Sequence, residues 1–291
     1  MLKNLVYFGS AQFTAEILES LIEAKIVNVV GVVTTPDRPV GRKQLITPSP
    51  LAKMAEGYSL PVYKPEKLDE ANLAHLKLLK PDYFLVVAYG QYFPKAWLEA
   101  PTHKTLNIHF SLLPKYRGSL CVSEPLKNGD QETGVTLMEM GEKLDRGPII
   151  AQQKVNIDTN DDVASLSTKL TESAKNLLLH DFVVYLDEGI CATNQNETEA
   201  TFTPSYKTRT KQNAFIDFDV VSGAISGTNA LQIHNLIRSQ NPDPGAWTII
   251  DDKETKLLKT SFKDNKLVID TIQVSGKNPI SWKQFLSGAK I

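Results

Sequence analysis

The chain has 291 residues, of which 42% are hydrophobic and 22% charged, with a formal net charge of −1, as is usual for a soluble globular protein of one or two domains. No run of 18 apolar residues is present, and the first residues lack the apolar segment and cleavage site of a signal peptide, so neither a membrane span nor export is expected. Cys121 and Cys191 lie far apart and form no paired framework, which argues against a disulfide scaffold, a zinc site or a redox pair and favours a cytoplasmic protein.

Short apolar runs alternate with helical patterns through the first two-thirds of the chain. The runs predict strands and the three- to four-residue spacing predicts helices between them. This alternation indicates an α/β fold with a Rossmann-like, doubly wound, mostly parallel sheet. Strands are predicted at 5–9, 29–35, 83–89, 105–110, 134–140 and 148–157, and helices at 14–24, 70–79 and 161–186, with Asn160 or Asp161 as the cap of the last.

The last third has a different pattern. Residues 189–211 are rich in Asn, Thr, Glu and Pro, and indicate a linker. A helix over 229–239 and strands at 246–250, 256–262 and 266–273 predict a small open β-barrel of the OB type. Residues 201–291 carry 12 Lys and Arg against 8 Asp and Glu. We therefore predict domains at 1–188 and 207–291, joined by a linker over 189–206.

A polar pair ends one of the predicted strands. Asn107 and His109 are two residues apart and so lie on one face of the 105–110 strand. Polar groups at the rim of an edge strand are the ordinary alternative. The turn that begins at Pro114, however, places the pair at the carboxyl end of the strand, where open α/β sheets bind ligands. An Asn amide can donate to an oxyanion, a contribution of about 3–4 kcal/mol in comparable sites. A His can transfer protons near neutral pH.

Asn107, His109 and Asp145, in this order and spacing, resemble the catalytic trio of the folate-dependent formyltransferases. Further motifs resemble the methionyl-tRNA formyltransferase family and follow one another along nearly the whole chain, at 8–10, 35–42, 48–50, 86–90, 128–136 and 241–247. The resemblance implies an enzyme that transfers the formyl group of 10-formyltetrahydrofolate to the α-amino group of initiator methionyl-tRNA. It also implies that 1–188 is the catalytic domain and 207–291 a tRNA-binding domain, shorter than in other members.

The resemblance implies roles for individual residues. Asn107, His109 and Asp145 are the expected catalytic residues, and Asp145 would orient His109 or relay a proton. The folate would bind, largely through backbone groups, to Ala88, Tyr89, Gly90, Gln91, Tyr92, Phe93, Ser111, Leu112, Leu113, Pro114, Met138, Glu139 and Met140. The methionyl-tRNA would contact Ser10, Phe13, Arg38, Arg42 and Lys43, and the loop that carries the last three would enter the acceptor stem. No metal site is expected, because the five histidines show no ligand spacing.

Two other hypotheses stay open. An amino-sugar N-formyltransferase would share the chemistry but use another acceptor. A folate- or tRNA-binding paralogue without turnover is suggested by unusual residues beside the trio, at 119–125 and at Gly141, Lys143 and Arg146. A nicotinamide site is not indicated, since the first strand is followed by a single glycine. A monomer is expected.

Overall fold

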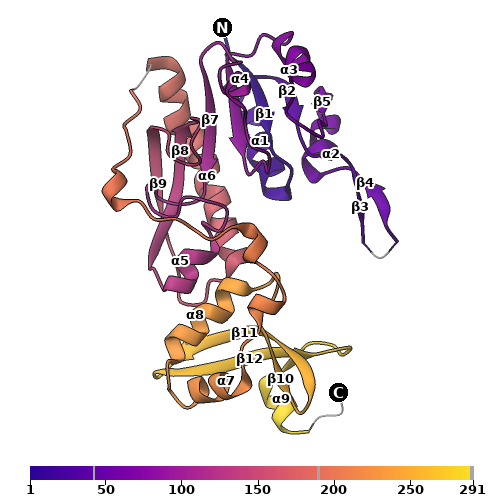
Figure 1. The fold of residues 1–291 in the computed structure, drawn as a ribbon, viewed down its shortest axis with the longest axis vertical. Coiled ribbons are helices and arrows are strands. Elements are labelled where there is room, and N and C mark those ends of the chain that lie inside the picture. Colours follow the sequence, from indigo (N-terminus) through magenta and orange to yellow (C-terminus); the bar gives the residue numbers. More distant parts are fainter. Residues whose placement is uncertain (42, 189–190, 289–291) are drawn as a thin grey trace. The chain divides into compact units, whose positions relative to one another are not determined.

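The computed structural model describes residues 1–41, 43–188 and 191–288. Its contacts divide the chain into two compact units (Figure 1). The sheet unit comprises Met1–Arg117, Gly134–Lys154 and Leu170–Thr201, and the small unit comprises Gly118–Thr133, Val155–Lys169 and Phe202–Ile291. The domain boundaries predicted at 188 and 207 stay a prediction.

A seven-stranded sheet forms the first part of the fold. Its order is β5-β2-β1-β6-β7-β8-β9. Neighbouring strands from β5 to β7 are parallel, and β8 is antiparallel to β7. The predicted mostly parallel α/β sheet is thus confirmed. The strands are β1 (Asn4–Phe8), β2 (Asn28–Val33), β5 (Val62–Tyr63), β6 (Tyr83–Val87), β7 (Lys104–His109), β8 (Glu132–Glu139) and β9 (Ile149–Asn156).

Both faces of this sheet are covered, as a doubly wound sheet requires. Side chains alternate along β1, so that Val6 and Phe8 face a cluster that contains Trp97 and other aromatic rings. Tyr7 faces the other way and donates a hydrogen bond to the carbonyl of Thr14 on helix α1, at 2.8 Å. The apolar run at 5–8 is therefore buried on two sides.

Two helices of the sheet unit begin at residues whose side chains cap them. Ser49 caps α2 and Asp69 caps α3 through their side-chain oxygens. The predicted cap of the long helix was wrong: Asp162 accepts from the backbone nitrogen of Ser165, while Asp161 accepts from Lys169 instead. The helices are α1 (Gln12–Ala24), α2 (Pro50–Gly57), α3 (Glu70–Lys77), α4 (Lys95–Leu98) and α6 (Val163–Glu188), which runs through both units.

The segment after β2, which the sequence predicts only as a loop, forms a hairpin. Its strands β3 (Arg38–Val40) and β4 (Leu45–Thr47) are antiparallel, and Figure 1 shows them extending away from the sheet. Three apolar side chains on it are more than half exposed: Val40, Leu45 and Ile46. Short strands of three residues gave too little periodicity to be predicted.

The small unit is built around a four-stranded antiparallel sheet of order β10-β11-β12-β13. Its core joins this sheet to α7 and α8 through buried Val221, Ile237, Leu257 and Ile272. A small β domain after the α/β sheet is confirmed. The elements are α5 (Ser123–Asn128), the 3-10 turns η2 (Tyr206–Thr208) and η3 (Gln212–Ala214), α7 (Phe218–Ile225), α8 (Ala230–Gln240), β10 (Trp247–Ile250), β11 (Lys253–Lys263), β12 (Lys266–Val274), β13 (Ile280–Ser281) and α9 (Trp282–Leu286). A further 3-10 turn, η1 (Glu197–Glu199), belongs to the sheet unit.

Two buried side chains of α8 fix the segment that leads into α6. His234 contacts the Thr159 carbonyl at 2.8 Å and the Thr260 hydroxyl at 2.9 Å. Arg238 donates to the carbonyls of Asp158 and Asp161, both at 3.1 Å. Residues distant in sequence are thereby held in one unit. Within the described ranges, every helix is too short or too polar to span a bilayer.

Candidate active site

The predicted site residues come from strands that end at the same edge of the sheet. β1, β6 and β7 are adjacent and parallel. Ser10 follows β1, Ala88 follows β6, and His109 is the last residue of β7. The carboxyl ends of such strands form the usual ligand-binding edge of an open α/β sheet. The fold therefore gathers three of the predicted segments at one place.

His109 is held between two groups and its side chain is only 7% exposed. Its Nε2 lies 3.0 Å from the Tyr116 carbonyl oxygen. Because a carbonyl can only accept, Nε2 carries the hydrogen and donates it. The other ring nitrogen, Nδ1, then faces the Asp145 carboxylate, with Oδ2 at 3.8 Å. Nδ1 is consequently the atom that can gain or lose a proton, beside a negative charge.

Asn107 lies two residues before His109 on the same face of β7, and it is half-buried. Its neighbours across the sheet are Val86 on β6 and Met138 on β8. In the part of the chain that the structure describes, its side-chain amide has no hydrogen-bond partner. This amide is therefore available to an oxygen of a bound substrate.

The predicted segment Ser111–Pro114 is fixed by one buried threonine. The Thr136 hydroxyl donates to the Ser111 carbonyl at 2.6 Å and accepts from the Leu113 nitrogen at 3.1 Å. Gln152 adds bonds to the Thr136 hydroxyl and the Leu113 carbonyl, both at 2.8 Å. Sequence analysis gave Thr136 and Gln152 no role, since their contacts with 111–113 join strands that are distant in sequence. They make the loop beside His109 rigid.

The predicted segment 88–93 divides between surface and core. Ala88 and Gly90 are exposed, and Ala88 has a left-handed backbone with φ of 46°. Tyr89 and Phe93 pack into the aromatic core, and burial raises the pKa of Tyr89 to about 12. Gln91 bonds the Tyr89 hydroxyl at 3.1 Å. Tyr92 is 72% exposed. Backbone groups and Tyr92 are thus the open part of this segment.

Residues 138–140 run along β7 in the opposite direction. Met138 is buried beside Asn107, and Met140 packs against the aromatic core. The Glu139 carboxylate bonds Lys104 at 3.0 Å and the Tyr185 hydroxyl at 3.1 Å. The side chains of these three predicted folate residues therefore contact other residues of the protein, so that a ligand could contact them mainly through their backbone groups.

The predicted tRNA residues lie at two places in the sheet unit. Ser10 is half-buried, and its hydroxyl accepts from the Thr35 nitrogen at 3.3 Å. Phe13 packs edge-on against Phe110, with ring centroids 5.4 Å apart. On the hairpin, Lys43 is exposed and Arg38 pairs with Glu66 at 2.7 Å. Arg42 lies outside the described residues.

A buried arginine that sequence analysis did not assign lies just after Tyr116. The Arg117 side chain is 1% exposed, and it donates to Gln195 and Glu197. Gln195 in turn donates to the backbone carbonyls of Asp145 and Gly147, at 3.0 and 2.8 Å. The residues lie about 80 positions apart along the chain, so no local pattern could have predicted the contact.

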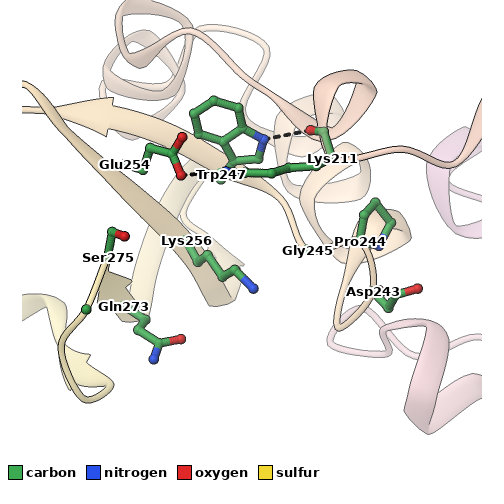
Figure 2. A pocket seen from close by; sticks show the side chains of 10 residues that line it. Lys211, Asp243, Pro244, Gly245, Trp247, Glu254, Lys256, Gln273 and Ser275 are labelled. Atoms are coloured by element: carbon green, nitrogen blue, oxygen red, sulfur yellow. Dashed lines mark hydrogen bonds and ion pairs between the residues drawn. The ribbon is translucent and has the colours of Figure 1, made fainter. Parts of the chain in front are cut away.

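The small unit has a pocket of its own, of about 530 Å³ (Figure 2). Trp247 forms one wall and donates through its indole nitrogen to the Lys211 carbonyl at 2.7 Å. Lys211 reaches over the indole ring and pairs with Glu254 at 2.5 Å. Lys256 lies in the same pocket, and no ion pair engages it among the described residues. Its ammonium group is therefore available to an anionic ligand.

The described residues contain no group of His, Cys, Asp and Glu that is suited to hold a metal ion.

Comparison with known proteins shows that this chain is similar to the formyl transferases. The family described as "Formyl transferase" matches residues 3–181, and "Formyl transferase, C-terminal domain" matches residues 210–267. The methionyl-tRNA formyltransferase of Lactobacillus gasseri is 34% identical over 99% of this chain and 96% of its own length. The chain therefore belongs to the methionyl-tRNA formyltransferase family, and the predicted family is confirmed.

Solved structures agree on the fold. The methionyl-tRNA formyltransferase from Clostridium thermocellum is 14% identical with a TM-score of 0.61, over 94% of this chain and 99% of that one. An N-formyltransferase from Helicobacter canadensis, in complex with folinic acid and dTDP-3-aminofucose, is 21% identical with a TM-score of 0.62, over 91% and 89%. At these identities the likeness concerns the fold alone.

Proposed function

We propose that this protein transfers the formyl group of 10-formyltetrahydrofolate to the α-amino group of initiator methionyl-tRNA. The observation that carries the proposal is the similarity to a methionyl-tRNA formyltransferase along 99% of the chain. The close approach of His109 and Asp145 at the end of β7 supports it independently. We further propose that the protein acts as a monomer in the cytoplasm.

In the proposed mechanism each member of the trio has one task. The folate supplies a formyl carbon that the amine attacks, which places negative charge on the formyl oxygen. The free Asn107 amide donates a hydrogen bond to that oxygen, a contribution of roughly 3–4 kcal/mol. His109 takes the proton of the attacking amine at Nδ1, and the Asp145 carboxylate at 3.8 Å stabilises the imidazolium. The imidazolium then gives this proton to the donor nitrogen of the folate as the bond between that nitrogen and the formyl carbon breaks, which releases tetrahydrofolate. A free α-amino group has a pKa of roughly 7.7–8, so a useful fraction is already neutral.

The segments proposed for the folate carry open backbone and exposed apolar side chains. A Cβ added at Gly90 or Gly141 would meet no atom within 4 Å, so the backbone there is open. Tyr92 and Leu144 are 72% and 74% exposed. A flat heteroaromatic ring would be bound by apolar surface of this kind together with fixed backbone polar groups. These features suit a pterin without requiring the side chains already used in the core.

For the tRNA we propose two contact surfaces, each described within its own unit. The hairpin β3–β4 presents Lys43 and exposed Val40, Leu45 and Ile46. In the small unit, Lys256 on β11 is the cross-strand neighbour of Trp247 on β10. A lysine that no carboxylate engages can bind backbone phosphate. The net +4 charge of residues 201–291 has the sign that a polyanion needs.

An amino-sugar acceptor is the second candidate, since an N-formyltransferase solved in complex with dTDP-3-aminofucose shares the fold. The test is an assay of formyl transfer from 10-formyltetrahydrofolate to methionyl-tRNA and to an amino-sugar nucleotide, side by side. We expect kcat/KM for methionyl-tRNA to exceed that for the sugar by at least about a hundredfold. Preference for the sugar would refute the proposed acceptor. Folate binding without turnover on either acceptor would favour the paralogue that has lost catalysis.

A further inference from the structure

The segment between α6 and η2 contacts both residues that hold His109. At one end of this 195–201 segment, the Gln195 side chain donates to the carbonyls of Asp145 and Gly147. At its other end, the Thr201 hydroxyl accepts from the Tyr116 nitrogen at 2.8 Å. Asp145 faces Nδ1 of the imidazole and the Tyr116 carbonyl faces Nε2. One short segment thus fixes both partners of the catalytic ring.

Arg117 determines which way the Gln195 amide points. Its Nε and one terminal nitrogen donate to Gln195 Oε1, at 3.1 and 2.7 Å. Because the guanidinium can only donate, the oxygen must face it, and the amide nitrogen must face the carbonyls of Asp145 and Gly147. Nη1 and Nη2 of Arg117 also donate to the Glu197 carboxylate, at 2.9 and 2.7 Å. That bond holds the pKa of Glu197 below its usual range.

Asp145 needs such support because of its backbone. Its φ is 52°, in the left-handed region, which residues with a side chain adopt less readily than glycine. The next residue but one, Gly147, packs so tightly against the Glu139 carbonyl that no Cβ fits there. Donation from Gln195 to the carbonyls of both residues fixes the turn in the conformation that aims the carboxylate at His109.

We propose that Gln195 is a positioning residue for formyl transfer, acting through Asp145. The inference deepens the proposed function and rests on it. Two variants test it. Gln195→Glu keeps the length of the side chain and still pairs with Arg117, but it cannot donate to the two carbonyls. Gln195→Ala removes both contacts. Asn196→Ala is the control, because that neighbouring amide bonds Thr198 and Glu199 in its own turn.

Each Gln195 variant should lower kcat about tenfold, with the KM for methionyl-tRNA within twofold of wild type, because a misplaced catalytic group slows the chemical step more than binding. In an Asp145→Asn background the same changes should cost less than about twofold, since residues that act as a unit are not additive. In the absence of substrate, the NMR chemical shifts of the His109 ring should differ from those of wild type in the Gln195 variants and should match them in Asn196→Ala.

The outcomes separate the inference from the proposed function. Wild-type protein that transfers no formyl group refutes the function, whereas the NMR comparison still tests the contact. Active wild type with equally active Gln195→Glu refutes the positioning role. An equal loss in both backgrounds would mean that Gln195 does not act through Asp145. If a thermal melt shows that Gln195→Ala is not folded at the assay temperature, the activity of Gln195→Glu tests the positioning role, because that variant keeps the contact with Arg117.

Discussion

Asp145→Asn should lower kcat for formyl transfer by about a hundredfold. The change removes one negative charge and keeps the size of the side chain. At 3.8 Å from Nδ1 of His109 and an effective dielectric constant of about 20, the lost attraction on a charged imidazole is about 4 kcal/mol. The amide dipole and water recover part of this, because the Asp145 side chain is 11% exposed. A net loss of roughly 3 kcal/mol in the transition state corresponds to about a hundredfold in rate.

The assay is initial-rate formyl transfer at saturating 10-formyltetrahydrofolate with methionyl-tRNA varied. We expect the KM to stay within about twofold, since the carboxylate stabilises a charge that develops after binding. Asp181→Asn, at an exposed position of α6, is the matched control and should leave kcat unchanged. Thermal melts must show that both variants are folded. If Asp145→Asn retains more than half of the wild-type kcat, the assignment of the proton-transfer pair is wrong.

Three further predictions concern other parts of the molecule. Asn107→Ala should lower kcat by roughly a hundred- to a thousandfold through loss of the oxyanion donor, and a loss below about fivefold in the same assay would contradict that role. Lys256→Ala should weaken methionyl-tRNA binding and lower its salt dependence by about one phosphate contact, as measured by filter binding at several salt concentrations. Lys253→Ala, at an exposed position outside the pocket, is the control and should change neither quantity. Equal effects of the two variants would contradict a specific contact. Burial lowers the pKa of His234, so this imidazole stays neutral in the folded protein while the unfolded chain takes up a proton there below pH ~6.5. The free energy of unfolding should therefore fall as the pH drops below that value. Urea titrations at several pH values should show a smaller decrease for His234→Gln than for wild type.

Much of the fold could be predicted because its signals are local. The apolar runs of β1 and β6 are buried on both faces, so continuous hydrophobicity was enough to identify them, whereas β7 was identified by the alternation of its apolar and polar residues. Short elements such as β5 and the strands of the hairpin have two or three residues, too few for a period to be detected. The α6 cap was misplaced because Asn160, Asp161 and Asp162 are equally good capping types, and only the folded structure shows that Asp161 pairs with Lys169, eight positions further along the chain.

By itself, the sequence determined the family, the mostly parallel sheet and the three candidate catalytic residues, because motif order and strand period are properties of neighbouring residues. The tertiary structure decided how His109 is held: which nitrogen carries the hydrogen, how near Asp145 comes, and that Arg117 and Gln195 support the Asp145 turn. These contacts join residues up to about 80 positions apart. They form only when the sheet brings distant loops to one edge, so no local pattern of side chains encodes them.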